Sequence, residues 1–511
     1  MKSEEGRGAC ILPHGVLFRG NAEYDIRKYI VKQHYIKGII SLPPNIFFGT
    51  GIPASIIIID KKNKDSRNGI FFIDAKDGFK KDGAKNRLRE QDIKRIVDAW
   101  DAQQNIPHYC RMVEWNEIEK NDYNLNIPRY IRPVDKEVQH DIEAHLHGGL
   151  PAFDIDNMDA FWKACPTLKD SLFQLKNNGY YSLKPQKAEI SNVIDNDTSY
   201  KEQGTAFAQL LNEWKEAVKP QMLAISQGER PKELITEWSK SLLAKVLGHS
   251  GLVDAYEVYD VLLNYWAETM QDDCYMISND GWTYPEVKAV KRKETTDKKT
   301  KQTKVKETVC MYDEIVCDLL PVSVVLAEYF SVETAEIVKL SELIDRKQAD
   351  MDDLVEQNTE VFAIGDDDEQ EENKEVSVKA ADVKAAIKNA KKDGTSEENV
   401  KLLQQWIALS NEKDALNKSL KEKRSQLTDA VVAKYSVLTE DEIKMLVVER
   451  KWLASVISGC KALMQNVTHR ISNDITALVE RYETTLSETT NAINDLEKEV
   501  LASLQEMGFT V

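Results

Sequence analysis

The segment Ile46–Pro53 combines two phenylalanines with Gly49, Thr50 and Gly51. A glycine-rich loop can cradle a phosphate with its backbone N–H groups when it follows a strand and opens a helix. This segment lacks a third glycine and runs into residues 54–59, an isoleucine-rich run that is typical of a strand. A phosphate cradle is therefore not predicted. No Walker A pattern occurs, so an ATPase lacks its first requirement.

Two short clusters could suggest metal chemistry. His145 and His147 form a His-x-His, and Asp272 is followed by Asp273. A metal site needs further ligands at suitable spacing, and none is evident, so we predict no metal. The seven cysteines are odd in number and lack CxxC spacing, which indicates reduced thiols in a cytoplasmic protein.

Residues 287–306 form a basic stretch in a chain whose formal net charge is −17. Binding to DNA phosphates needs a local basic face, and Lys291, Arg292 and Lys293 are candidates for it. The alternative interpretation, a mobile solvated loop, is the one we favour. Arg19 is a further possible DNA contact, whereas Arg27 is expected to be a solvated arginine at a helix end.

The elements that would position these residues begin with an α/β region. The residue pattern predicts a buried strand at 9–13, an amphipathic helix at 22–33, strands at 36–40, 54–59 and 69–73, and a helix at 88–100. The apolar face of the first helix is expected to carry Ile26, Tyr29 and Ile30. Polar residues 63–68 suggest a hairpin-like connection. Such a piece cannot cover both faces of its own sheet, so we expect Met1 to lie inside a domain or to begin a split subunit.

The remaining chain is expected to be mainly helical. Residues 105–135 are interpreted as a linker, and 140–350 as helices anchored by tryptophans. Residues 400–430 and 441–507 carry apolar stripes near a period of 3.5, which predicts a long antiparallel coiled-coil hairpin. No apolar run approaches the ~18 residues that a membrane span needs.

Several blocks together resemble a known family. They are Gly8-Ala-Cys-Ile-Leu-Pro-His-Gly-Val-Leu-Phe-Arg-Gly20, Ile39-Ile-Ser-Leu-Pro43, Ile46-Phe-Phe-Gly-Thr-Gly-Ile-Pro53 and Asn121-Asp-Tyr-Asn-Leu-Asn-Ile-Pro-Arg-Tyr130. In this order they resemble the modification subunit of type I restriction–modification systems, a family of adenine-specific DNA N6-methyltransferases. Residues 256–282 resemble the helical region of one branch less specifically. The resemblance implies the C-terminal part of a Rossmann-like class I methyltransferase sheet, followed by a mainly α region.

The resemblance also implies a mechanism whose central parts are missing here. A flipped adenine would lie near the methyl group of S-adenosylmethionine, held by an (Asn/Asp)-Pro-Pro-(Tyr/Phe) motif. No Asn-Pro-Pro or Asp-Pro-Pro occurs, and Leu42-Pro43-Pro44-Asn45 is not that motif. No Phe-x-Gly-x-Gly loop follows an early strand. We therefore assign no catalytic residue, place the cofactor site outside this chain, and expect the chain to be inactive alone.

What the resemblance leaves to this chain is one wall of a base pocket. Phe47, Phe48, Gly49 and Thr50 occupy the block that contacts the flipped base in the family; the alternative is that the phenylalanines are core residues. The implied partners are DNA, the specificity and restriction subunits, and an N-terminal methylase half. The second interpretation is a non-enzymatic scaffold or docking subunit of a DNA-bound complex.

The predicted organisation has four parts. These are the C-terminal half of the methylase domain (1–135), a helical domain with the basic loop 287–306 (136–360), an acidic linker (361–395) and a coiled-coil hairpin (396–511). The hairpin most simply stabilises itself. An unmatched apolar stripe on its longer second arm would invite a partner helix, and the family resemblance implies that this helix belongs to the specificity subunit, for which the hairpin would be a docking arm.

Overall fold

A computed structural model describes residues 5–132, 140–176, 179–249, 251–282, 287, 290–296, 303–362, 378–393 and 397–507. The described chain is mostly helical, with a small mixed sheet. It forms two compact units. Met1–Pro220, Arg230–Gln271 and Ser455–Val511 make the first, and Gln221–Glu229 and Asp272–Ala454 make the second. The linear boundaries expected from the sequence differ from this division and remain our proposal. Residues 363–377, 394 and 395 of the acidic linker lie outside the described residues.

The mixed sheet belongs to the first unit and has the order β1-β3-β2-β4-β7. Its strands are β1 (Arg7–Pro13), β2 (Ile36–Ser41), β3 (Ala54–Asp60), β4 (Gly69–Asp74) and β7 (Cys110–Glu114). β2 and β4 are parallel, β3 is antiparallel to β1 and β2, and β7 is antiparallel to β4. β1, β2 and β4 therefore run in one direction and end at the same edge of the sheet.

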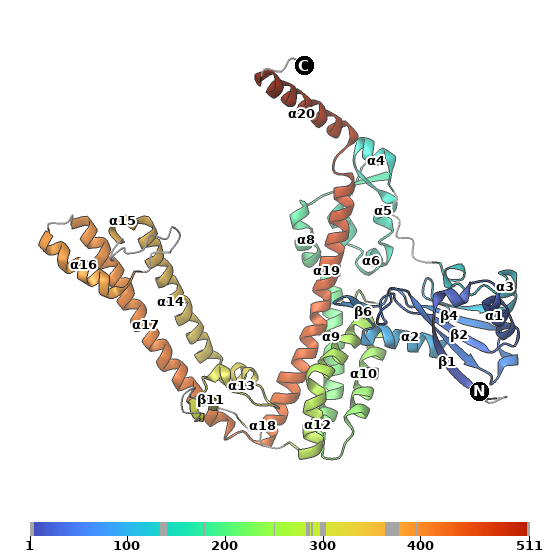
Figure 1. Cartoon of the computed structure of the whole chain (residues 1–511), viewed down its shortest axis with the longest axis horizontal. Helices are drawn as coiled ribbons and strands as arrows, with labels where there is room; N and C mark the ends of the chain where they lie inside the picture. The colour runs from blue at the N-terminus through green and yellow to red at the C-terminus, as the bar shows by residue number, and fades with distance from the viewer. Residues whose placement is uncertain are drawn as a thin grey trace. The chain divides into compact units, whose positions relative to one another are not determined.

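Helices cover both faces of this sheet (Figure 1). On one face, Ile39 and Phe72 pack with α1 (Ala22–Lys32) and α3 (Trp115–Lys120). On the other face, Ile40 and Phe71 pack with α2 (Glu90–Ala102). Because successive residues of a strand point to opposite faces, these apolar runs supply both cores. Helices on both faces were predicted, and the described residues have them.

Three local predictions are wrong. β3 and β4 do not form a hairpin, because β2 lies between them. Residues 110–120, inside the expected linker 105–135, are part of the domain, because β7 joins the sheet and α3 packs on it. β1 is an edge strand rather than a buried one, and Ile11 and Leu12 are exposed. Two short strands, β5 (Lys80–Asp82) and β6 (Lys85–Arg87), form a separate small hairpin.

α1 turns a different face inward from the one predicted. Ile26 and Tyr29 are 60% and 62% exposed, whereas Arg27 is 7% exposed. The Arg27 guanidinium donates to the backbone oxygens of Tyr123, Val16 and Arg19 at 2.8, 2.9 and 3.0 Å. Arg27 is therefore a buried structural residue and not a solvated arginine. Three charge-assisted hydrogen bonds offset the cost of its burial.

Helices make up most of the remainder of the first unit. They are α4 (Ile142–His147), α5 (Ala152–Asp156), α6 (Asp159–Ala164), α7 (Leu168–Leu172), α8 (Ile190–Asn196), α9 (Thr198–Leu223), α10 (Pro231–Leu247), α11 (Ala255–Tyr265), α19 (Ala454–Tyr482) and α20 (Leu486–Glu506). The strands β8 (Leu150–Pro151), β9 (Phe173–Leu175) and β10 (Tyr180–Leu183) form a small sheet among them. Trp162, Trp214, Trp238 and Trp266 are buried, as predicted for anchors. α11 packs on α2, where the Tyr256 hydroxyl donates to Asp98 at 3.2 Å.

The second unit contains a long antiparallel helix pair. Its helices are α12 (Gln271–Asp280), α13 (Val322–Tyr329), α14 (Ser331–Gln357), α15 (Thr359–Phe362), α16 (Ala380–Asp393), α17 (Glu397–Tyr435) and α18 (Glu440–Met445). α14 packs along α17 with Lys347 on Glu412 and Glu336 on Lys423, so the two helices are antiparallel. The partner of α17 is thus α14. The predicted pairing of residues 400–430 with 441–507 is not confirmed.

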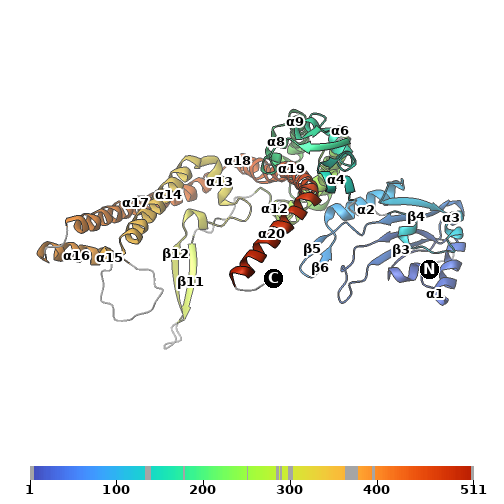
Figure 2. The same cartoon turned by 90° about the horizontal axis from the view of Figure 1, so that it is seen from above.

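The basic stretch forms an antiparallel hairpin of β11 (Val290–Thr296) and β12 (Thr303–Val309) in the second unit (Figure 2). A solvated loop was favoured from the sequence, and for these two strands that interpretation is wrong. Alternating lysine, threonine and valine suits a strand, but the high charge concealed this pattern. The residues between the two strands lie outside the described residues.

Candidate functional site

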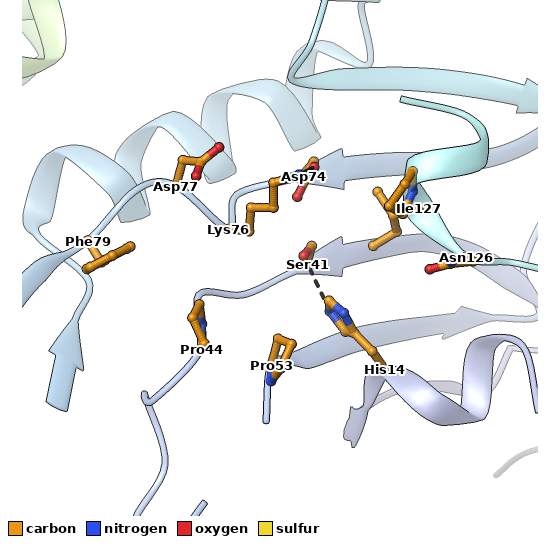
Figure 3. A pocket seen from close by; sticks show the side chains of 11 residues that line it. His14, Ser41, Pro44, Pro53, Asp74, Lys76, Asp77, Phe79, Asn126 and Ile127 are labelled. Carbon is orange, nitrogen blue, oxygen red and sulfur yellow. Dashed lines mark hydrogen bonds and ion pairs between the residues drawn. The ribbon is translucent and has the colours of Figure 1, made fainter. Parts of the chain in front are cut away.

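A pocket of about 450 Å³ lies where β1, β2 and β4 end (Figure 3). Ligands of open α/β sheets bind at the carboxyl ends of the strands, because the loops there present side chains from several strands to one place. The residues that line the pocket are His14, Ser41, Pro44, Pro53, Asp74, Lys76, Asp77, Phe79, Asn126, Ile127 and Pro128. The polar members therefore come from the ends of three strands that run in one direction and from the turn after α3.

His14 and Ser41 form the first polar contact of this pocket. His14 Nε2 lies 3.1 Å from the backbone oxygen of Ala54 and 3.3 Å from Ser41 Oγ. Burial lowers the pKa of His14, so its ring is neutral at neutral pH. To donate to the Ala54 carbonyl, Nε2 of the neutral ring must carry its proton, so it has no lone pair with which to take the proton of Ser41. The pair suits ligand positioning rather than covalent catalysis.

Asp74 supplies an unused hydrogen-bond acceptor. Its Oδ2 pairs with Lys76 Nζ at 3.0 Å, while its Oδ1 is buried and has no hydrogen-bond partner in the described part of the chain. A buried acceptor that lacks a donor costs about 1 to 3 kcal/mol. A ligand that carries an N–H or O–H group would remove this cost. The pocket thus combines an acceptor for a donor group with a neutral imidazole.

Phe79 is the aromatic side chain that lines the pocket. Asn126 lies on the opposite side, in a turn where its backbone N–H donates to Asn124 Oδ1 at 2.9 Å. An aromatic ring beside polar groups is the usual lining for a planar heterocycle. Sequence reasoning missed Phe79 because it follows β4 in a segment without a recognisable motif. It also missed His14, Ser41 and Asp74, although each stands at the end of a predicted strand.

The predicted base-binding residues lie on the loop that joins two pocket residues, Pro44 and Pro53. Phe48 is 90% exposed and Phe47 is 37% exposed, and neither is among the lining residues. The amine of Lys85 lies over the Phe48 ring. The Thr50 hydroxyl accepts from the backbone of Ile52 at 3.1 Å.

The conformation of this loop depends on glycine. Gly49 has a φ of +78°, a conformation that suits glycine. Asn86 holds the start of the loop through Nδ2, which donates to the backbone oxygen of Pro44 at 2.7 Å. Phe47 and Phe48 stay a prediction for base binding, and they are placed on a loop beside the pocket.

None of the predicted DNA contacts is among the residues that line this pocket. Arg19 is exposed and faces Glu23 across 3.7 Å. Lys291, Arg292 and Lys293 lie in β11, which belongs to the second unit. Among the described residues, no group of three or more His, Cys, Asp or Glu could hold a metal ion. None of the described helices is both long and apolar enough to cross a membrane.

The first 139 residues match the model of the N-6 DNA Methylase family. The match contains the whole five-stranded sheet and every residue that lines the pocket. The family resemblance that the sequence indicated is therefore confirmed for this part of the chain.

Curated relatives include methylase subunits of type I restriction enzymes. The MpnII methylase subunit of Mycoplasma pneumoniae is 33% identical over 144 residues, which are 28% of this chain and 26% of that protein. The MjaVII methylase subunit of Methanocaldococcus jannaschii is 39% identical over 140 residues, or 27% of this chain and 24% of that protein. This chain thus spans about a quarter of the length of the curated relatives it matches.

A solved structure shows a similar match. The type I restriction–modification methyltransferase subunit from Streptococcus thermophilus has 43% sequence identity, with 25% of this chain and 26% of that chain covered and a TM-score of 0.23.

Proposed function

We propose that this chain forms part of a site-specific adenine DNA N6-methyltransferase, the modification subunit of a type I restriction–modification system. In this proposal the chain supplies one wall of the base pocket, and a second polypeptide supplies the S-adenosylmethionine site and the (Asn/Asp)-Pro-Pro-(Tyr/Phe) motif. The complete enzyme methylates DNA, and this chain alone is inactive. The Rossmann-like character of the complete sheet belongs to the same proposal.

The observation that carries the proposal is the pocket at the strand ends, inside the residues that match the methylase family. An extruded adenine offers a planar ring and an exocyclic amine, and enzymes that modify a base must take it out of the stack. The free Oδ1 of Asp74 suits an amine donor, and Phe79 suits a ring. In the complete enzyme, these residues would orient the base while the second polypeptide performs methyl transfer.

The described residues do not fit S-adenosylmethionine. β1 ends at Pro13 and is followed by His14 rather than by a glycine-rich turn, and Gly49-Thr50-Gly51 leads into β3. A backbone cradle for the cofactor needs glycines between a strand and a helix. The proposal therefore gives this chain no step that involves the cofactor.

An open apolar surface beside β1 supports completion by another polypeptide. In the part of the chain that the structure describes, β1 pairs only with β3, and its outer edge pairs with no strand. An apolar groove of about 350 Å³ lies between β1 and α1, and its lining includes Leu12, Val16, Ile26 and Ile30. Unprotected apolar strand edges recruit further strands. The exposed Ile26 and Tyr29 face of α1 fits the same interpretation.

Reconstitution tests this proposal directly. The chain is combined with an N-terminal methylase polypeptide that carries the two missing motifs and with a specificity subunit, and transfer of a labelled methyl group to adenine in duplex DNA is measured. We expect transfer from the mixture and none from the chain alone. Methyl transfer or S-adenosylmethionine binding by the chain alone would contradict the proposed incompleteness. A mixture that binds DNA without any transfer would contradict the assignment as a methyltransferase part.

α20 supports the second candidate, a docking or scaffold role. Leu486, Ile493, Leu496 and Val500 share one helical face, and each is more than half exposed. Such a stripe suits a partner helix, and we propose a helix of the specificity subunit as that partner. Ile493→Glu with Val500→Glu should abolish co-elution with the specificity subunit. Asn491→Glu with Ala502→Glu adds the same charge on the opposite face and should leave co-elution intact; equal behaviour of the two variants would refute the docking role.

A further inference from the structure

The ribbon formed by β11 and β12 separates its charges by face. Directly opposed residues of an antiparallel pair share a face, and successive residues of a strand alternate between faces. The register places Lys293 opposite Lys306, Lys291 opposite Thr308 and Thr295 opposite Lys304. These six positions, here called the lysine face, contain four lysines, two threonines and no acidic residue.

The other face carries the acidic residues of the two strands. There the register places Arg292 opposite Glu307 and Glu294 opposite Val305. The register therefore collects every lysine position of the two strands on one face and the acidic positions on the other. A face of lysine positions suits a polyanion.

Residues on both sides of the ribbon are fixed in the second unit. Before it, the Trp282 indole donates to the backbone oxygen of Ile225 at 2.8 Å. After it, Cys310 is buried, and the backbone N–H of Tyr312 donates to the Thr428 hydroxyl at 3.0 Å. The ribbon projects from the helices of this unit (Figure 2). It therefore extends from an ordered base.

The composition of the strands selects the kind of polyanion. β11 and β12 contain no aromatic residue, so they offer no platform on which the bases of a single strand could stack. They also lack the Trp, Phe and Leu residues with which a membrane-surface element inserts into lipid. Lysine and threonine are common donors to phosphate oxygens of duplex DNA.

We propose that the lysine face binds the phosphate backbone of duplex DNA and reads no sequence. The choice of DNA among polyanions rests on the proposed function. In this role the ribbon would hold the duplex while recognition and chemistry take place elsewhere. Each phosphate contact releases counterions, so the ribbon would make affinity strongly dependent on salt.

The test measures binding of the full chain to a labelled duplex by fluorescence anisotropy across salt concentrations. The variant replaces Lys291, Lys293, Lys304 and Lys306 with glutamine. Each lost phosphate contact lowers the salt slope by roughly 0.9, so the slope should fall by about 3 to 4. The control variant removes the same charge from exposed positions of α14 and α17. It replaces Lys339, Lys401, Lys418 and Lys421 with glutamine. Its slope should change by less than about 1.

Three results would overturn the proposal. They are no binding of duplex DNA by the wild-type chain at low salt, equal slopes for the two variants, and a preference for vesicles of anionic lipid over duplex DNA. Circular dichroism verifies that both variants remain folded. Methyl transfer in the reconstituted mixture with an unaltered DNA slope would refute the ribbon proposal while leaving the proposed function intact. A salt slope that falls in the lysine variant, without any methyl transfer by the reconstituted mixture, would support the ribbon proposal and refute the proposed function.

Discussion

Each unit contains a buried aspartate paired with a lysine, and the two pairs differ in what surrounds them. In the second unit, Asp273 lies 2.6 Å from Lys451, and the two side chains are 3% and 7% exposed. In the first unit, Asp74 lies 3.0 Å from Lys76, and the two side chains are 4% and 34% exposed. The N–O distances alone do not distinguish the two ion pairs.

The remaining hydrogen bonds distinguish the two pairs. Asp273 Oδ2 also accepts from the Trp452 indole at 2.7 Å, and Lys451 also donates to the backbone oxygen of Leu319 at 2.8 Å. Asp74 Oδ1 has no donor among the described residues, and Asp74 lines a pocket. A closed, hydrogen-bonded pair holds helices together, whereas an open pair leaves an acceptor for a ligand. The difference teaches that unused hydrogen-bonding capacity, not the presence of an ion pair, indicates a site.

The largest effect, a loss of stability, is expected for the closed pair, Asp273 and Lys451. Asp273→Ala leaves the Lys451 amine buried without its carboxylate, which should lower the free energy of unfolding by about 3 to 5 kcal/mol. Chemical denaturation of the full chain measures this. Asp272, the exposed neighbour, serves as the control, and its replacement with alanine should have an effect below about 0.5 kcal/mol. Similar unfolding curves for the two variants would show that the closed pair does not hold the unit together.

Replacement of Asp74 in the open pair, Asp74 and Lys76, should affect activity more than stability. Asp74→Ala should change the free energy of unfolding by less than about 1 kcal/mol, because Lys76 can be hydrated. Adenine methylation by the reconstituted enzyme should fall roughly 10- to 100-fold, as expected for a lost hydrogen bond to a charged acceptor. An unfolded Asp74→Ala variant, or one with full activity, would erase the distinction between the pairs.

A comparison of aromatic residues tests whether the pocket or its neighbouring loop holds the base. Stacking of a base on an aromatic ring contributes about 1 to 3 kcal/mol, so Phe79→Ala should reduce kcat/KM of the reconstituted enzyme roughly 5- to 100-fold. Phe47→Ala and Phe48→Ala test the prediction from the sequence in the same assay. If neither loop variant alters kinetics, the loop phenylalanines have no role in base binding. If only Phe79→Ala leaves kinetics unaltered, the pocket assignment is wrong.

The smallest effect concerns His14. Its folded-state pKa is lowered by burial below the ordinary value of 6.5, so the unfolded chain binds the proton more strongly as pH falls. Stability should therefore be full above pH 6.5 and should decline on acidification below it. The histidine resonance that disappears in His14→Gln gives this pKa by NMR titration. A value at or above 6.5 would contradict a buried, neutral ring.

The sequence predicted the central strands but not their order in the sheet. Runs such as Ala54–Ile59 are long enough for periodicity to mark a strand, and the structure has β2, β3 and β4 close to the predicted bounds. The order of strands depends on tertiary pairing, so the insertion of β2 between β3 and β4 was missed. The partner of α17 was missed for the same reason, because an apolar stripe does not name the helix that covers it.

The candidate site was predictable only in part. His14, Ser41 and Pro53 belong to the family blocks and line the pocket, although none of them was predicted as a site residue. Asp74 and Phe79 fall outside the blocks and become neighbours of His14 only when three strands end at one edge. The buried face of α1 was also predicted wrongly, since Arg27 is buried and donates to the backbone oxygen of Tyr123, which lies far away in sequence.

The open edge of β1 has a consequence for how the protein must be made. An unpaired apolar edge is a template for aggregation whenever its natural occupant is scarce. If a second polypeptide completes the sheet as proposed, chain made in excess of that polypeptide would be lost to insoluble material or to proteases. Balanced synthesis of the occupant would therefore act as a dosage control. The soluble yield of the chain, with and without co-expressed partner, reports whether that control exists.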